Sequence, residues 1–208
     1  MRIAIIGAGS VGRALGGGWA RQGHEISFGV RSPADPKYGD LPPGTRVAGV
    51  GEAAAEAEVV VLATPWDGTR DAIDRCGDLA GRVVVDCTNP LEPDLSGLTL
   101  GHDDSAGEQV ARWAPGAKVV KAFNSVGSNI MENPRVGGQR AVMFIAGDDE
   151  GKATVRRLSE ALGFDTVDAG GIDKARLLEP LAMLWISLAY QQGMGREWAL
   201  TLVRAAGP

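Results

Sequence analysis

The first twelve residues, MRIAIIGAGSVG (1–12), decide the fold, because they join a short apolar strand directly to a glycine-rich turn. Gly7, Gly9 and Gly12 have the G-x-G-x-x-G spacing that is typical of a dinucleotide-binding turn between a strand and a helix. In such a turn the first glycine permits a tight bend, the second lets a diphosphate approach the backbone, and the third lets the helix lie close to the strand. The stretch therefore predicts a diphosphate site at the amino end of a helix, where free backbone N–H groups favour negative charge.

The rest of the chain alternates apolar runs with helix-like segments. This alternation predicts an α/β fold with a doubly wound, mostly parallel sheet, in which ligands bind beyond the carboxyl ends of the strands. We expect strands at residues 2–6, 25–30, 46–49, 58–63, 82–86, 118–122, 141–146 and 165–168. We expect helices at residues 11–22, 52–57, 66–75, 103–113 and 150–162, and a helical tail from about 174 to 204. Residues 1–170 would then form a nucleotide-binding domain, and residues 171–208 a helical segment for substrate-pocket and dimer contacts.

The composition argues against several classes of function. The chain has 208 residues and a net charge of −5, so we expect no partner among nucleic acids or anionic membranes. Its two cysteines and two histidines lack ligand spacing, which predicts neither a metal site nor a disulfide framework. The amino terminus lacks a signal-peptide pattern, and no apolar run is long enough to cross a bilayer. We therefore expect a cytoplasmic protein.

The end of the second expected strand indicates which dinucleotide binds. It reads Gly29-Val30-Arg31-Ser32 and lacks the carboxylate that usually accepts hydrogen bonds from the ribose 2′-hydroxyl of NAD. The Arg31 guanidinium can instead form forked hydrogen bonds to a 2′-phosphate, and Ser32 can donate another. Lys37, in a stretch rich in proline and glycine (31–45), would add a charge if that stretch folds inward. The pattern favours NADP(H).

Two polar loops follow strands at the same edge of the predicted sheet. Thr64 and Pro65 follow the fourth strand, and Asn89 and Pro90 follow the fifth. We expect these four residues to contact the cofactor. Two structural alternatives stay open: Thr64 and Asp67 match a helix-capping box, and Asn89-Pro90 also matches an ordinary turn.

The sequence lacks the motifs of acid–base or nucleophilic catalysis. It contains no Gly-x-Ser-x-Gly elbow, Walker lysine loop or HExxH motif, so we expect no catalytic side chain. Hydride transfer between two stacked rings depends chiefly on orientation, which such a chain can provide. The candidates to line the pocket of a second ring, a small-molecule redox acceptor, are Trp66, Asn89, Phe123 and Asn124.

These motifs together resemble a known family, the NADP oxidoreductases that depend on coenzyme F420, an 8-hydroxy-5-deazaflavin. The matching segments are residues 1–12, 29–32, 63–66, 86–91 and 121–125, and residues 168–171 and 175–182 are similar to bacterial members. The resemblance implies a Rossmann domain, a small carboxyl-terminal helical part at the deazaflavin pocket, and a homodimer. It also implies direct hydride transfer between nicotinamide C4 and deazaflavin C5.

The resemblance further implies particular contacts. Backbone groups of Gly9, Ser10 and Val11 would bind the cofactor, and Arg31 and Ser32 its 2′-phosphate. Some relatives carry a hydroxyl residue at the position of Val30, which would place more weight on Ser32.

Three alternatives remain for the activity. The same domain resembles the cytoplasmic reductase part of membrane ferric reductases, so FMN or FAD stands beside F420 as a possible co-substrate, and flavin reductase activity as the corresponding function. An imine reductase resembling pyrroline-5-carboxylate reductase is another enzyme, although residues 171–208 are short for its helical dimerisation domain. The alternative outside enzymes is a non-catalytic NADP-sensing module.

Overall fold

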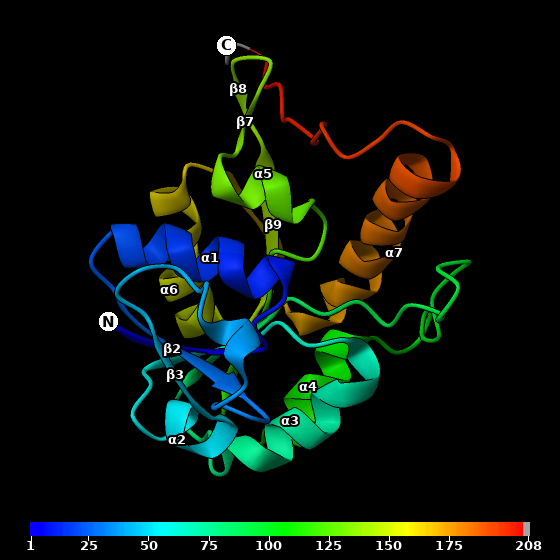
Figure 1. Ribbon diagram of the computed structural model, residues 1–208. Helices are drawn as coiled ribbons and strands as arrows, with labels where there is room; N and C mark the ends of the chain where they lie inside the picture. The colour runs from blue at the N-terminus through cyan, green and yellow to red at the C-terminus, as the bar shows by residue number, and fades with distance from the viewer. Residues whose placement is uncertain (206–208) are drawn as a thin grey trace.

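The computed structural model describes residues 1–205 and has one large sheet of eight strands (Figure 1). Its strands are β1 (Arg2–Ile6), β2 (Glu25–Val30), β3 (Arg46–Gly49), β4 (Val59–Leu62), β5 (Val83–Asp86), β6 (Lys118–Lys121), β9 (Val142–Gly147) and β10 (Asp165–Gly170). They lie in the order β10-β9-β6-β5-β4-β1-β2-β3. Every neighbouring pair is parallel except β6 and β9. The six neighbouring strands β6-β5-β4-β1-β2-β3 have the order of a doubly wound dinucleotide-binding fold, which confirms the predicted fold class.

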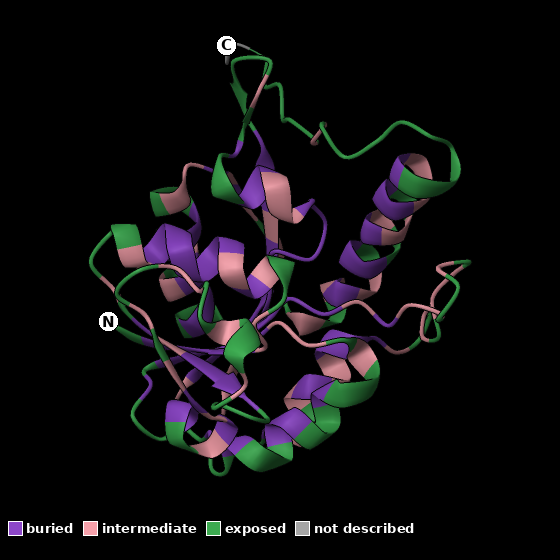
Figure 2. Cartoon of the chain, in the orientation of Figure 1, coloured by how far each residue is buried: buried purple, intermediate pink, exposed green. Residues whose placement is uncertain are grey.

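Helices cover both faces of this sheet. They are α1 (Ser10–Arg21), α2 (Val50–Ala55), α3 (Thr69–Cys76), α4 (Ala106–Trp113), α5 (Ser128–Glu132) and α6 (Asp149–Leu162). Helix α7 (Ala175–Ile186) belongs to neither core, and its Trp185 and Ile186 form a separate apolar cluster. Side chains of α1, α5 and α6 form one hydrophobic core with the sheet, and those of α2, α3 and α4 form a second core on the other face. Figure 2 shows the buried faces of these helices turned toward the sheet. The central strands β4 and β5 are buried at every residue, as expected between two helical layers.

Helix α1 lies unusually close to its neighbours because of the glycines at 16–18. A Cβ atom at Gly16 would come within 2.6 Å of Cζ of Phe28, and one at Gly18 within 2.4 Å of Cδ2 of Leu162. The next residue, Trp19, is fully buried and donates from Nε1 to the Leu158 carbonyl of α6 at 3.1 Å. These contacts fix α1 against β2 and α6, and thereby fix the position of its amino end.

Several element boundaries differ from the prediction. The helix expected at 103–113 begins at Ala106, because the Ser105 hydroxyl caps it by accepting from the Glu108 backbone N–H. The hairpin of β7 (Arg135–Val136) and β8 (Gln139–Arg140) and the short helix α5 were not expected.

The predicted helical tail is wrong beyond residue 192. Helix α7 continues as a π-helical turn over Ser187–Gln191, and residues 193–205 contain no helix. Gly193 and Gly195 both have φ of +73°, which ends the helical path. The chain then folds back, with the Trp198 ring stacked on Trp185 at 5.7 Å between centroids. Residues 206–208 of the predicted segment lie outside the described residues.

Within residues 1–205, the longest apolar helices fall short of what a membrane span requires.

We predict that Gly16→Ala lowers the free energy of unfolding by about 1 kcal/mol. Overpacking against the buried Phe28 ring typically costs about 1–3 kcal/mol, which exceeds the gain in helix propensity of about 1 kcal/mol. Gly17→Ala is the matched control, because its Cβ would meet only Pro42 and Arg21 atoms at 3.3–3.5 Å. Urea denaturation of both variants measures the difference. Equal stability of the two would contradict the close-packing explanation.

Candidate functional site

The glycine turn between β1 and α1 is tightly packed at two of its three glycines. Gly7 has φ of +109°, and a Cβ there would lie 2.5 Å from the Ala63 carbonyl oxygen. A Cβ at Gly12 would lie 2.2 Å from the Gly7 carbonyl oxygen. Both positions exclude a side chain for reasons inside the protein itself, since the first bends the chain and the second brings α1 against the turn.

Gly9 differs from these two glycines, because nothing in the protein requires it. Its φ of −79° and ψ of −171° suit any residue, and a Cβ would meet no atom within 4 Å. Gly9 is the N-cap of α1, where no side chain caps the helix and the first turn has no acidic residue. The open space and the unpartnered N–H groups fit a diphosphate that approaches the backbone, so the residues present match a dinucleotide.

A cavity of about 570 Å³ extends from this turn toward the end of β2. Its lining includes Arg31, Lys37 and, from α3, Arg75. The Arg31 side chain is exposed and forms no hydrogen bond or ion pair with any residue in 1–205. Lys37 pairs with Asp35, with Nζ and Oδ2 2.8 Å apart. The lining also contains Asp67 and Asp71, and Asp71 pairs with Arg75 at 2.7 Å. The guanidinium of Arg31 is therefore the cation of this group best placed to bind a phosphate. Ser32 is exposed and not part of the lining.

The loop after β4 forms one wall of this cavity through Thr64 and Pro65. The expected capping box is wrong: the 3₁₀ turn Trp66–Gly68 starts after Pro65 without a side-chain cap. The Thr64 hydroxyl instead lies 2.9 Å from that of Thr69. The Trp66 ring stacks on Trp113 of α4, with centroids 5.2 Å apart. The Trp66 ring was expected to face a second ligand, but one of its faces is covered by Trp113.

The loops after β5 and β6 are joined by two asparagines. Asn89 Nδ2 donates to the Asn124 carbonyl at 2.9 Å, and Asn124 Nδ2 donates to Asn89 Oδ1 and to the Leu178 carbonyl of α7, both at 3.0 Å. Asn124 Oδ1 is buried without a partner among the described residues. Pro90 is buried, and its carbonyl accepts from the Thr99 backbone N–H at 2.7 Å. The two loops and α7 therefore form one hydrogen-bonded unit.

The ring of Phe123 belongs to the hydrophobic core. It is 1% exposed and makes edge contacts with Trp19 and Phe164, with centroids 5.7 and 6.0 Å apart. The backbone at Phe123 has φ of +59°, a left-handed conformation that turns the chain sharply after β6. The buried ring of Phe123 thus anchors the start of the loop in the core, and Asn124 is the next residue of this loop.

A buried ion cluster at the ends of β5 and β6 was missed by the sequence reasoning. Lys121 Nζ lies 2.9 Å from Asp86 Oδ2 and 2.8 Å from Glu179 Oε1 of α7. Glu179 also accepts the backbone N–H groups of Ala106 and Gly107 at 3.0 Å. Burial alone would lower the pKa of Lys121, but the two carboxylates outweigh it and raise that pKa. The available signal was the position of Lys121 between the apolar residues Val120 and Ala122 at the end of a central strand, since a charge buried there requires a partner.

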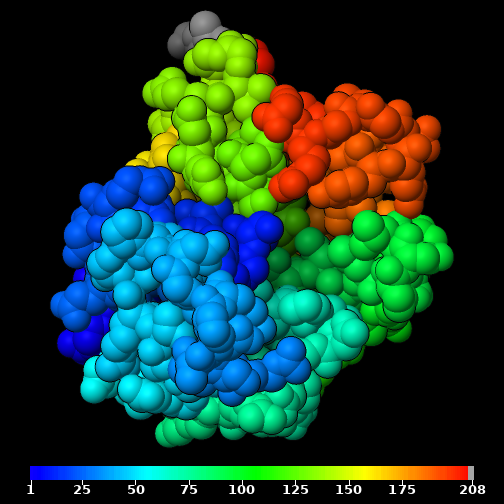
Figure 3. Space-filling model, in the orientation of Figure 1, coloured from blue at the N-terminus to red at the C-terminus, as the bar shows by residue number. Residues whose placement is uncertain are grey.

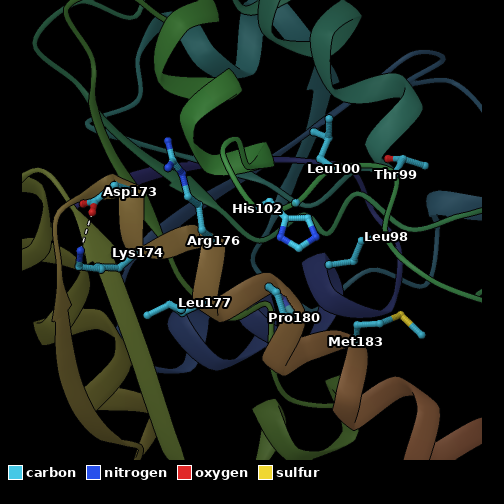
Figure 4. A pocket seen from close by; sticks show the side chains of 11 residues that line it. Leu98, Thr99, Leu100, His102, Asp173, Lys174, Arg176, Leu177, Pro180 and Met183 are labelled. Atoms are coloured by element: carbon cyan, nitrogen blue, oxygen red, sulfur yellow. Dashed lines mark hydrogen bonds and ion pairs between the residues drawn. The ribbon is translucent and has the colours of Figure 1, made fainter.

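A second cavity, of about 890 Å³, lies between α7 and the loop at residues 98–102 (Figure 4). Leu98, Leu100, Leu177, Pro180 and Met183 give it an apolar surface. Its lining contains no residue of the glycine turn or of the loops after β4 and β6. Figure 3 shows a separate hollow between the glycine-turn side of the molecule, in blue, and α7, in orange. The cavity beside the glycine turn and this second cavity beside α7 share no lining residue and are therefore distinct.

Comparison with known proteins identifies the family. The family model described as "NADP oxidoreductase coenzyme F420-dependent" matches residues 2–90. A crystal structure from Arthrobacter sp. FB24, assigned as an F420-dependent NADP reductase, is 34% identical and has a TM-score of 0.90. The match covers 98% of this chain and 100% of that one.

Two curated relatives extend the comparison. The F420-dependent NADP reductase of Methanothermobacter marburgensis is 28% identical, over 90% of this chain and 92% of that protein. The rat metalloreductase STEAP3 is 30% identical over 88% of this chain, which spans only 37% of the length of that relative. The resemblance that the sequence motifs indicated is confirmed, and this chain belongs to the family of coenzyme F420-dependent NADP oxidoreductases.

Proposed function

We propose that this protein is an NADP(H)-dependent oxidoreductase that transfers a hydride between the nicotinamide and a deazaflavin, coenzyme F420, with a flavin as the alternative acceptor. The observation that carries the proposal is Gly9, whose open face at the uncapped start of α1 borders a cavity ending at the unpaired Arg31. Family membership supports the deazaflavin as acceptor.

The chain's own residues divide into three groups along the site. Backbone N–H groups of Gly9, Ser10 and Val11 bind the diphosphate, since α1 begins there without a side-chain cap. The 2′-phosphate binds at Arg31, with contributions from Ser32 and Lys37. Gly7, Thr64 and Pro65 line the same cavity and orient the rest of the cofactor. Gly12, Asn89 and Pro90 lie outside this lining, and we propose that they support it from the neighbouring turn and loop. When bound, NADP(H) supplies a hydride donor or acceptor at its nicotinamide.

The acceptor side is built from the hydrogen-bonded loops and α7. Asn89 and Asn124 contribute polar groups, and the buried Asn124 Oδ1 is an acceptor without a hydrogen-bond partner among residues 1–205. Trp66 and Phe123 hold the backbone of their loops through stacking and core contacts. Hydride transfer between two rings depends chiefly on their orientation, and the proton that the reduced acceptor takes up comes from solvent, so we propose that these residues act by orienting the two rings.

We propose that the protein acts in the cytoplasm as a homodimer. Leu177 and Leu184 are 64% and 56% exposed and lie two turns apart on one face of α7, which supports an apolar contact between two copies.

The state of the cysteines bears on the compartment. Cys76 and Cys87 are buried free thiols, which suits a reducing compartment.

We predict that Gly9→Ala weakens NADPH binding at least tenfold while the protein stays folded. The new methyl group would occupy the space in front of the helix, yet it meets no protein atom. Its cost to stability is at most about 1 kcal/mol, the difference between glycine and alanine as an N-cap. Titration calorimetry measures the dissociation constant, and Gly97→Ala, also free of contacts, is the control. Unchanged affinity of the Gly9 variant would refute a diphosphate at this position.

We predict that Arg31→Ala raises KM for NADPH by roughly 10- to 150-fold, the loss expected for a charge-assisted hydrogen bond of about 1.5–3 kcal/mol. KM for NADH should change less than about twofold, because NADH lacks the 2′-phosphate. Steady-state kinetics with both cofactors tests this. Arg157→Ala, on the far helix α6, controls for loss of charge. An equal effect on both cofactors would overturn the NADP assignment.

The acceptor can be identified by stopped-flow absorbance with NADPH and three candidates: coenzyme F420, FMN and a cyclic imine. We expect fast reduction of F420, because the proposed site orients two flat rings and hydride transfer between them depends chiefly on orientation. Reduction of FMN alone would establish the flavin alternative. Turnover with the imine alone, or tight NADPH binding without turnover of any acceptor, would contradict the proposed activity.

A further inference from the structure

Arg13, on the first turns of α1, reaches from the helix to two separate backbone segments. Its Nε donates to the Ala8 carbonyl inside the glycine turn at 2.9 Å. Its Nη1 donates to the carboxylate and the carbonyl of Asp40, at 2.9 and 3.3 Å, and its Nη2 donates to the Lys37 carbonyl at 3.2 Å. One guanidinium therefore joins the glycine turn to the loop at residues 31–45.

This loop has no other polar anchor in the described part of the chain. All its remaining hydrogen bonds and ion pairs join two residues of the loop itself, such as Asp35 with Lys37 and Thr45 with Pro42. The loop carries Arg31 at its start and Lys37 in its 3₁₀ turn, η1 (Pro36–Tyr38). The side chain of Arg13 is thus the polar connection between the diphosphate cradle and the residues proposed to bind the 2′-phosphate.

The backbone at Lys37 is held from both sides. Its N–H donates to Asp35 Oδ1 at 3.1 Å, and its carbonyl accepts from Arg13. Lys37 and Arg13 line the same cavity as Gly9 and Arg31. The hydrogen bond from Arg13 also holds the pKa of the exposed Asp40 carboxyl below its usual range, so the carboxylate stays charged at neutral pH.

The donor count shows how the guanidinium is used. An arginine has five N–H donors, and the acceptors Ala8, Asp40 (twice) and Lys37 engage four of them. Little hydrogen-bonding capacity is left for a ligand, so the side chain acts mainly on the protein. A lysine could not replace it, because an ammonium group lacks the rigid fork that spans acceptors on separate segments.

We propose that Arg13 is a positioning residue that fixes the loop at residues 31–45 beside the glycine turn and thereby sets the preference for NADP(H) over NAD(H). It acts through Lys37 and Arg31, and it does not bind the phosphate itself. The inference rests on the proposed function, since it assumes a 2′-phosphate at that end of the cavity.

The test compares Arg13→Met, Arg13→Lys and the wild-type protein in binding NADPH, NADH and adenosine 2′-monophosphate by calorimetry, with KM and kcat in parallel. We expect Arg13→Met to weaken the binding of NADPH and of adenosine 2′-monophosphate about tenfold, which corresponds to the loss of one to two hydrogen bonds, with kcat unchanged. The affinity for NADH should change less than about twofold. Arg13→Lys should not restore the lost affinity. Arg21→Met, on the last turn of the same helix and outside the cavity, is the matched control.

The outcomes separate the inference from the function on which it rests. Equal weakening of NADPH and NADH binding by Arg13→Met would show that the charge acts on the diphosphate. Recovery of NADPH affinity in Arg13→Lys would show that a charge at this position acts on the cofactor itself. Either result would overturn the inference. A wild-type protein that binds NADPH no better than NADH would instead refute the proposed cofactor. If Arg13→Met fails to fold, Asp40→Ala is the second variant, because the Asp40 side chain is 78% exposed and its loss removes the carboxylate that accepts from Arg13. This variant should weaken the binding of NADPH, but not of NADH, by a smaller factor. No selectivity change in Asp40→Ala would then count against the inference.

Discussion

The close approach of α1 to the turn that precedes it is the constraint on which the site depends. The distance of 2.2 Å between a Cβ built at Gly12 and the Gly7 carbonyl oxygen leaves no room for a side chain, so the helix begins directly against the end of β1. The buried contacts of Gly16, Gly18 and Trp19 hold the rest of the helix in that position. As a result, the first-turn N–H groups and Gly9 open onto the cavity that leads to Arg31.

The sequence predicted the sheet well because its signals are local. Apolar runs such as Val59–Leu62 and residues 83–85 must be buried on both faces, and the turn at Gly7 to Gly12 has its own characteristic spacing. The directions of aromatic rings were not predictable in this way. Trp66 turns to Trp113, and Phe123 lies between Trp19 and Phe164, partners that are distant in sequence. The prediction of a long helical tail was wrong because the apolar pattern continues past Ile186. The helix nevertheless ends before the two glycines with left-handed backbone, and the chain folds back so that Trp198 contacts Trp185.

The polar connections of the site likewise follow from tertiary structure. Arg13 is an ordinary surface residue in a helical pattern, and only the folded loop at residues 31–45 supplies its acceptors. Asn89 and Asn124 follow different strands and meet because parallel strands end at the same edge of the sheet. Sequence reasoning could name these asparagines as candidates, but it could not find the Leu178 carbonyl that ties them to α7.

The buried cluster of Lys121, Asp86 and Glu179 limits how the molecule can move. Breaking one partner out of a buried ion pair costs several kcal/mol, typically about 3–5, because a charge is left uncompensated in the interior. Helix α7 carries Glu179, so an outward swing of the helix would break its ion pair with Lys121 and leave the buried N–H groups of Ala106 and Gly107 without their acceptor. Adaptation to ligands of different size near this helix must therefore come from side-chain rearrangement and from the irregular residues 193–205, while the helix itself behaves as part of the rigid frame.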